Sequence, residues 1–259
     1  MTRIYGFATS LALIAVGVLS VNSSPLHAAQ PTADDAPIAL VTGANRGLGL
    51  ELARQLQDKG YFVIGTARKP EKADELRALG ARVEQLDVTD SDSVKALAER
   101  LGDTHIDLLV NNAGIFPRNN SIETFDFEGA AKAFDVNSLG PMRVTQGLIP
   151  QLRRGKGKTI VQVSSLMGSI EANTRGTSYE YRASKTALNS FNKTLSIELG
   201  PEGFTCVVVH PGWVKTDMGG PNAHLAPEES IRGLVGIIGD LSTEDNGRFF
   251  NYDGEPIAW

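Results

Sequence analysis

Short apolar runs alternate along most of the chain with longer segments in which apolar residues recur every three or four positions. The apolar runs span residues 38–42, 61–67, 82–88, 106–114, 158–165, 204–212 and 247–254. Helical periodicity is found at residues 48–60, 70–80, 91–102, 124–149 and 179–199. Short buried strands that alternate with helices are typical of a parallel sheet covered on both faces. We therefore predict an α/β fold built on a single, doubly wound parallel sheet with helices on both faces.

The N-terminal segment does not follow this alternation. Residues 4–33 contain no Asp, Glu, Lys or Arg, and residues 7–21 are mostly apolar. Arg3 precedes this run and small residues surround Ala28, which is the pattern of a secretory signal. The 18 residues at 4–21 are also long enough for a short membrane anchor.

We therefore divide the chain into a signal peptide or membrane anchor at 1–28, a linker at 29–36 and one folded domain at 37–259. A leader of this kind predicts export to the periplasm or membrane anchoring, with membrane contact through residues 4–21 only. The alternative is a cytoplasmic protein whose start site is misassigned, although the second methionine of the chain is Met142.

Composition narrows the classes of function. The formal net charge is −5, and the only dense basic run, at 153–158, is interpreted as a solvated turn, so we expect no nucleic-acid partner. Cys206 is the only cysteine, which excludes an intramolecular disulfide and a thiolate metal cluster. Metal-ligand spacing is absent among the four histidines, and we predict no metal; they are His27, His105, His210 and His224.

Three glycines lie where the first predicted strand turns into a helix. In the stretch TGANRGLG (42–49) they are Gly43, Gly47 and Gly49. Glycine permits a tight turn and the close approach of a ligand, and the N-terminus of a helix offers free N–H groups to an anion. In an open α/β sheet, ligands bind beyond the carboxyl ends of the strands, where this turn lies. The alternative is a tight turn without a ligand, but the position of the glycines favours a nucleotide cofactor.

Two tyrosines and a lysine lie close together in the stretch SYEYRASKTALN (178–189). Residues four apart share a helix face, so Tyr181 pairs with Lys185 while Tyr179 points elsewhere. A lysine ammonium favours the phenolate, and we expect Lys185 to lower the pKa of Tyr181 from its usual value of about 10. Tyr181 is then a candidate acid or base. The alternative is an unremarkable pair on the surface of a helix.

Seven motifs in a fixed order indicate which family the chain resembles. They are TGANRGLG (42–49), LDVTD (86–90), NNAG (111–114), VN ending at Asn137, VSS ending at Ser165, YRASK (181–185) and HPGWVKTDM (210–218). This set resembles the short-chain dehydrogenase/reductases, and the segments at 181–223 and 247–254 are most similar to sniffer-type carbonyl reductases and C-factor-like members. The resemblance covers the chain from about residue 38 onward and implies a Rossmann-like fold.

The end of the second predicted strand indicates the cofactor. A carboxylate at this place binds the adenosine ribose of NAD, whereas an arginine accommodates the 2′-phosphate of NADP. This chain has Ala67 and Arg68 there, and Arg46 in the glycine loop. A guanidinium forms forked hydrogen bonds with a phosphate, so we predict NADP(H) as the cofactor. The alternative is that both arginines are only exposed loop residues.

The resemblance implies further contacts with the cofactor. Asp87 and Val88 would contact the adenine, and Asn111, Ala113 and Gly114 would line the adenosine ribose. The rival interpretation of Asp87 is a turn at the end of a strand. The full set of expected cofactor-binding residues is Gly43, Asn45, Arg46, Gly47, Leu48, Gly49, Arg68, Asp87, Val88, Asn111, Ala113, Gly114, Tyr181, Lys185, Pro211, Val214 and Thr216.

Reduction of a carbonyl requires a hydride for carbon and a proton for oxygen. We predict Tyr181 as the acid in reduction and the base in the reverse oxidation, and by resemblance Lys185 also holds the nicotinamide ribose. Only one of the neighbours Ser164 and Ser165 can orient the substrate oxygen, because successive strand residues face opposite sides, and the resemblance selects Ser165. By resemblance Asn137 holds a water in the proton relay; a helix interruption is the alternative interpretation.

The predicted activity is transfer of a hydride from NADPH to the carbonyl of an aldehyde, ketone or quinone, or the reverse alcohol oxidation. One alternative is a noncatalytic dinucleotide sensor or C-factor-like signalling protein, against which the intact Asn–Ser–Tyr–Lys set argues. A second is a sugar epimerase or dehydratase of the extended relatives, against which the glycine spacing argues.

The substrate is expected to be a small molecule with apolar groups. Residues 219–227 form a short segment suited to a lid. Relatives often dimerise through long helices, so we expect a homodimer that uses residues 124–149 and 179–199. Apolar candidates for the walls of the substrate cleft are Phe116, Leu166, Met167 and Trp213.

Overall fold

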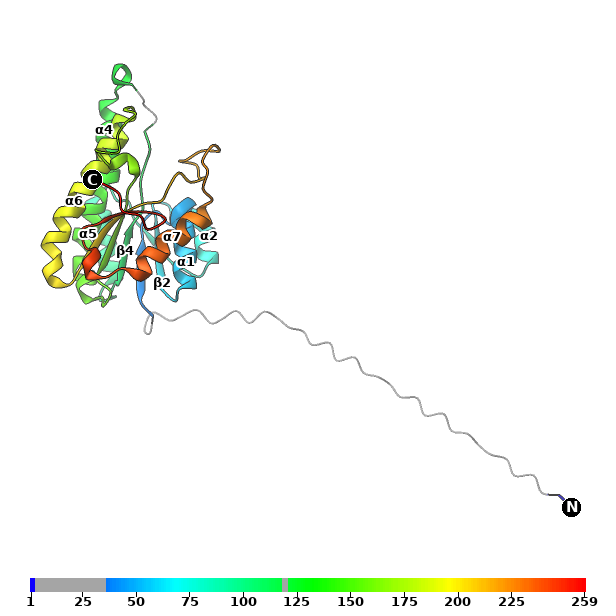
Figure 1. Cartoon of the computed structure of the whole chain (residues 1–259). Coiled ribbons are helices and arrows are strands. Elements are labelled where there is room, and N and C mark those ends of the chain that lie inside the picture. Colours follow the sequence, from blue (N-terminus) through cyan, green and yellow to red (C-terminus); the bar gives the residue numbers. More distant parts are fainter. Residues whose placement is uncertain (3–35, 118–120) are drawn as a thin grey trace.

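The computed structural model describes residues 1–2, 36–117 and 121–259, and its centre is one parallel sheet of seven strands (Figure 1). The strands are β1 (Ile38–Val41), β2 (Phe62–Ala67), β3 (Arg82–Gln85), β4 (Leu108–Asn111), β5 (Thr159–Val163), β6 (Thr205–His210) and β7 (Phe249–Asn251). Their order in the sheet is β3-β2-β1-β4-β5-β6-β7, and each neighbouring pair is parallel. The predicted doubly wound α/β fold is confirmed.

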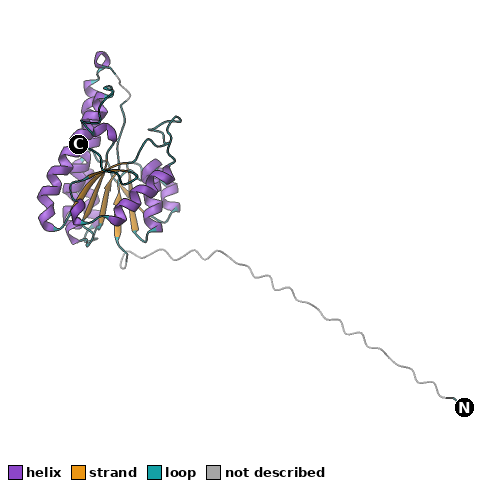
Figure 2. Ribbon diagram, viewed as in Figure 1, coloured by secondary structure: helices purple, strands orange, loops and turns teal. Residues whose placement is uncertain are grey.

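Helices cover both faces of this sheet (Figure 2). One face carries α1 (Gly47–Asp58), α2 (Asp74–Ala78) and α7 (Pro227–Asp240). The other carries α3 (Ser91–Leu101), α5 (Gly140–Arg154) and α6 (Tyr179–Leu199), and α4 (Phe127–Phe134) packs against α6.

Strand β1 shows how the apolar pattern divides the core. Ala39 and Val41 belong to the core beneath α1 and α7, whereas Ile38 and Leu40 belong to the core beneath α3 and α5. Successive side chains of a strand point to opposite faces, so a strand buried on both sides can be apolar at every position. For this reason the short apolar runs in the sequence mark the strands.

The predicted leader lies largely outside the described residues, including the apolar segment at 4–21. Among the helices that the structure does describe, none is both long and apolar enough to cross a membrane. The described residues also contain no group of three or more His, Cys, Asp or Glu side chains arranged to hold a metal ion.

Two predicted helices are divided in the structure. The segment at 70–80 forms a 3₁₀ turn at Pro70–Lys72 and then α2, because Ala73 between them has a non-helical backbone. The segment at 124–149 consists of α4, a π-helical turn at Asp135–Leu139 and α5. Pro141 has no N–H to donate to the carbonyl four residues earlier, which favours an irregular turn at this point.

The outer edge of β7 is covered by the segment that follows it. The N–H of Asn251 donates to the carbonyl of Glu255, and the N–H of Ile257 donates to the carbonyl of Phe249, both at 2.8 Å. Phe250 and Pro256 form an antiparallel bridge. Strand β7 is therefore paired on both sides.

The order of strands reverses at β1, which lies between β2 and β4. The segments that leave β1 and β4 consequently run side by side. The hydroxyl of Thr42 accepts hydrogen bonds from the N–H groups of Asn112 and Ala113, each at 3.0 Å. A topological switch of this kind is where α/β sheets bind ligands.

Gly49 in the first turn of α1 sets how closely the glycine loop packs at this switch. A Cβ atom at Gly49 would overlap the carbonyl oxygen of Gly43 and lie 2.6 Å from Nδ2 of Asn112. By contrast, a Cβ atom at Gly236 in α7 would meet no atom within 4 Å. The two glycines form a matched pair for substitution.

We expect Gly49→Ala to lower the free energy of unfolding by about 1–3 kcal/mol, because the added methyl group overpacks the loop. Gly236→Ala should raise it by about 0.5–1 kcal/mol, because alanine is the better helix former. Urea unfolding followed by circular dichroism measures both. Equal stabilities of the two variants would contradict the packing described for Gly49.

Candidate active site

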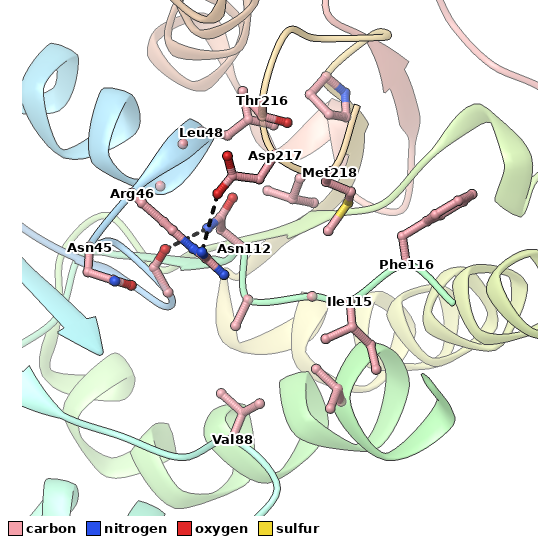
Figure 3. A pocket seen from close by; sticks show the side chains of 18 of the residues that line it. Asn45, Arg46, Leu48, Val88, Asn112, Ile115, Phe116, Thr216, Asp217 and Met218 are labelled. Carbon is pink, nitrogen blue, oxygen red and sulfur yellow. Dashed lines mark hydrogen bonds and ion pairs between the residues drawn. The ribbon is translucent and has the colours of Figure 1, made fainter. Parts of the chain in front are cut away.

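A cavity of about 670 Å³ opens at the carboxyl ends of the strands. It begins at the glycine loop after β1 and passes the ends of the neighbouring strands to the start of α6. Figure 3 shows part of its lining, including Arg46, Asn112 and Asp217. The cavity brings together the predicted residues Gly43, Asn45, Arg46, Gly47, Leu48, Gly49, Arg68, Asp87, Val88, Ala113, Gly114, Tyr181, Lys185, Pro211 and Thr216.

Two predicted cofactor-binding residues do not line the cavity. The side chain of Asn111 is buried and donates to the hydroxyl of Thr145, 3.3 Å away. Val214 is buried in a bridge with Leu225. In place of Asn111 the cavity is lined by Asn112, whose Nδ2 donates to the carbonyls of Thr42 and Gly43. Neighbouring residues at the end of a strand face opposite ways, and this alternation is a sequence signal that could have selected Asn112.

The glycine loop leaves the N-terminus of α1 open to the cavity. Gly43 and Gly47 have φ angles of 65° and 55°, which favour glycine. A Cβ atom at Gly43 would lie 3.1 Å from the Cα atom of Ala113. Arg46 is the N-cap of α1, and its side chain makes no capping hydrogen bond. The first N–H groups of the helix and its dipole therefore suit an anion.

Arg68 and Asp87 line the cavity just beyond the ends of β2 and β3. The carboxylate of Asp87 accepts hydrogen bonds from the N–H and hydroxyl groups of Thr89, at 3.0 and 2.7 Å. Partial burial acts to raise the pKa of Asp87, but these hydrogen bonds and the charges of Arg68 and Arg143 hold it below its ordinary value. Asp87 thus forms the turn considered in its rival interpretation and also faces the cavity.

Tyr181 and Lys185 face the cavity from the start of α6. Tyr181 is hydrogen-bonded to Ser165 and packs edge-on against Phe116, with ring centroids 4.6 Å apart. The Nζ atom of Lys185 lies 5.9 Å from the centre of the Tyr181 ring and donates to the carbonyl of Val163 at 2.8 Å. The two residues share a helix face, as their spacing predicts.

Burial moves the pKa values of this pair in opposite directions. Desolvation raises the pKa of Tyr181 to about 12, against the lowering effect of the hydrogen bond with Ser165. Desolvation also lowers the pKa of Lys185 to about 8. The sequence-based prediction that Lys185 lowers the pKa of Tyr181 is therefore wrong, because the cost of burying a phenolate is the larger effect. With a pKa of about 12, the phenol of Tyr181 stays protonated at neutral pH.

Ser164 and Ser165 face different ways at the end of β5. The hydroxyl of Ser164 donates to Oδ1 of Asn189 on α6 at 2.7 Å. The hydroxyl of Ser165 accepts from the N–H of Met167 at 3.1 Å and bonds with Tyr181. Ser165 is therefore the serine that lies beside the phenol.

Asn137 lies in the π-helical turn, fully buried behind the cavity. Its side chain accepts from the N–H of Ile115 at 2.8 Å and donates to the carbonyl of Ile115 and to the hydroxyl of Ser184. A Cβ atom at Gly114 would lie 3.3 Å from Oδ1 of Asn137 and 3.6 Å from Nζ of Lys185. Asn137 thus joins the strand-end loop to α6, within a helix irregularity of the kind that often marks functional sites.

The loop after β6 lies over the glycine loop. It closes at its base, where the N–H of Lys215 donates to the carbonyl of Leu225 at 2.9 Å. Trp213 donates from Nε1 to the carbonyl of Gly219 at 2.8 Å and packs edge-on against His224. The predicted lid at 219–227 is thus the second part of the loop that follows β6, and it ends at Pro227, the first residue of α7. Of the predicted apolar walls, Phe116 lines the cavity, whereas Leu166, Met167 and Trp213 do not.

Asp217 in this loop is a cavity residue that sequence reasoning missed. Its Oδ2 atom lies 3.2 Å from Nη1 of Arg46 (Figure 3). No sequence signal pairs these residues, because they are 171 positions apart and both lie in loops.

Comparisons with known proteins agree with this geometry. The chain matches the short chain dehydrogenase family over residues 37–225. It is 43% identical over 166 residues to the C-signal of Myxococcus xanthus, an alignment that covers 64% of this chain and 100% of that protein.

Solved structures with the same architecture include the carbonyl reductase Sniffer of Drosophila melanogaster. Its TM-score is 0.81 at 35% identity, covering 86% of this chain and 99% of that one. The NADPH-bound carbonyl reductase from chicken fatty liver has a TM-score of 0.80 at 34% identity, with the same coverage of 86% and 99%. This chain therefore belongs to the short-chain dehydrogenase/reductase family of oxidoreductases.

Proposed function

We propose that the protein is a carbonyl reductase that transfers a hydride from NADPH to the carbonyl carbon of an aldehyde, ketone or quinone. The observation that carries the proposal is the buried Tyr181 phenol, hydrogen-bonded to Ser165, with Lys185 one helical turn further along. Tyr181 and Lys185 line the end of a cavity that starts at the open N-terminus of α1, and Ser165 lies beside Tyr181, although it does not itself line the cavity. The same residues would act in the reverse alcohol oxidation.

The residues of the cavity fit NADP(H). The close approach of Gly43 to Ala113 and the free N-terminus of α1 suit a pyrophosphate. Arg46 and Arg68 both line the cavity and supply two guanidinium groups for a 2′-phosphate. The residue that precedes Arg68 at the end of β2 is Ala67, not the carboxylate that selects NAD. The chicken liver carbonyl reductase, which has bound NADPH, supports this choice.

NADPH supplies a hydride to carbon when it is bound, and the protein must supply a proton to oxygen. Tyr181 holds that proton at neutral pH because burial raises the pKa of the phenol. As the substrate oxygen becomes negative, Tyr181 donates its proton and Ser165 donates a hydrogen bond that stabilises the developing charge. The ammonium of Lys185 then stabilises the phenolate that remains, and Asn137 holds the loop and helix that position both groups.

The lining of the cavity favours a small carbonyl compound with an apolar part. Phe116 packs on Tyr181, and Met218 lines the cavity from the loop after β6 (Figure 3). The segment between Ser165 and α6 ends in three consecutive residues with positive φ, at 65°, 62° and 50° for Gly176, Thr177 and Ser178. This turn sets the start of α6 and hence the position of Tyr181.

The second candidate is a noncatalytic dinucleotide-binding or signalling protein. The similarity to C-signal of Myxococcus xanthus is the observation that favours it. The first candidate, an enzyme, is favoured by the presence of Asn137, Ser165, Tyr181 and Lys185 together. Consumption of NADPH with a panel of aldehydes, ketones and quinones, followed at 340 nm, separates the two candidates.

Tyr181→Phe should lower kcat/KM for NADPH-dependent reduction by about 10²- to 10⁴-fold, because it removes the proton donor. The dissociation constant of NADPH, measured by fluorescence titration, should stay within about twofold of the wild type, since only one hydroxyl is lost. Tyr179→Phe is the matched control and should retain near-normal activity. Comparable turnover in Tyr181→Phe would show that the acid is another group.

The rate of reduction should decline as the pH rises through about 8, where Lys185 loses its charge. The ammonium stabilises the phenolate left by proton transfer, so only the protonated form of Lys185 supports the step. Above this pH we expect kcat at saturating NADPH to fall about tenfold per pH unit. A flat profile of kcat between pH 7 and 10 would contradict the role of Lys185.

Arg68→Asp should weaken NADPH binding by about 10- to 100-fold and leave NADH binding unchanged or tighter. The reason is that the substitution replaces a guanidinium with a carboxylate at the expected 2′-phosphate. Arg232→Asp, on the surface of α7, makes the same change of charge away from the cavity and is the control. Fluorescence titration measures all four affinities, and an unaltered NADPH affinity in Arg68→Asp would refute the assignment.

A further inference from the structure

Arg46, one of the two arginines assigned to the cofactor, is already paired with a carboxylate of the chain itself. Its Nη1 atom lies 3.2 Å from Oδ2 of Asp217. The two side chains come from the glycine loop after β1 and the loop after β6, and both line the cavity. Figure 3 shows them turned toward each other.

The surrounding loop holds Asp217 in this place. Asp217 lies within a tight turn, in which the N–H of Gly220 donates to the carbonyl of Thr216 at 2.8 Å and the N–H of Gly219 donates to the hydroxyl of Thr216 at 3.2 Å. A Cβ atom at Gly47 would come within 3.8 Å of the Thr216 side chain. Asp217 is thereby kept beside the glycine loop, within reach of Arg46.

The ion pair can be exchanged readily. The side chain of Arg46 is 73% exposed and that of Asp217 is 85% exposed. Such an exposed pair adds little net stability, because water and salt screen both charges. Among the described residues, neither side chain forms another hydrogen bond or ion pair. An anion with more charge than one carboxylate can therefore displace Asp217 from Arg46.

We propose that Asp217 is a determinant of cofactor affinity that competes with the 2′-phosphate of NADP(H) for Arg46. The proposal rests on the proposed cofactor, and the carboxylate of Asp217 lowers the affinity for it in two ways. It occupies Arg46 before the cofactor binds, and it repels the phosphate dianion once displaced. Asp217 thus weakens the binding of NADP(H) selectively, whereas NADH, which lacks the 2′-phosphate, does not compete for Arg46. Looser binding favours release of the used cofactor.

The test is the dissociation constants of NADPH and NADH for Asp217→Asn, measured by nucleotide fluorescence without substrate. We expect NADPH to bind about three- to tenfold more tightly than to the wild type, and NADH to bind with unchanged affinity. The gain should diminish in 0.5 M salt, as for any exposed charge pair. Asp58→Asn is the matched control, because it removes the carboxylate of an exposed Arg–Asp pair at the far end of α1.

A double-variant cycle tests whether Asp217 acts through Arg46. In an Arg46→Met background, Asp217→Asn should change NADPH affinity by less than about twofold. If Asp217→Asn weakens the binding of NADPH and of NADH equally, the ion pair instead holds the loop over any dinucleotide. The proposed competition for Arg46 is then wrong. An unchanged NADPH affinity in Asp217→Asn also overturns it. Failure of the wild type to bind NADPH would instead refute the proposed function itself.

Discussion

The close approach of two backbone segments at the strand-order reversal is the constraint on which the site depends. Thr42 accepts hydrogen bonds from two successive N–H groups after β4, and Asn112 returns two to the carbonyls after β1. This mutual bonding brings Gly43 against Ala113, where a Cβ atom would lie only 3.1 Å from the Cα atom of Ala113. The cavity, the open N-terminus of α1 and the position of Arg46 all follow from that contact, because each lies directly beyond it.

Helix α6 carries the reactive side chains of this site. Its first turns place Tyr181 beside Ser165 and Lys185 beneath Gly114, and burial then separates the two pKa values. The phenol keeps its proton and the ammonium is poised to lose one near pH 8. These properties belong to the enclosed environment rather than to the residues alone, since the same pair on an exposed helix would be little perturbed.

Local rules predicted the features that depend on local geometry. The apolar runs located every strand, and the four-residue spacing correctly placed Tyr181 and Lys185 on one face of α6. Features set by distant parts of the chain were not predictable in this way. Burial of the phenol by surrounding elements reversed the expected direction of the Tyr181 pKa shift. Asp217 meets Arg46 only because two loops converge in space.

The covered edge of β7 bears on how copies of the chain can associate. An exposed outer strand offers a row of unused amides that recruits strands from other molecules. Here the segment that follows β7 occupies this edge, because the N–H of Asn251 donates to the carbonyl of Glu255 and the carbonyl of Phe249 accepts from the N–H of Ile257. A strand from another molecule therefore cannot add directly to β7, because both of its edges are already bonded within the chain.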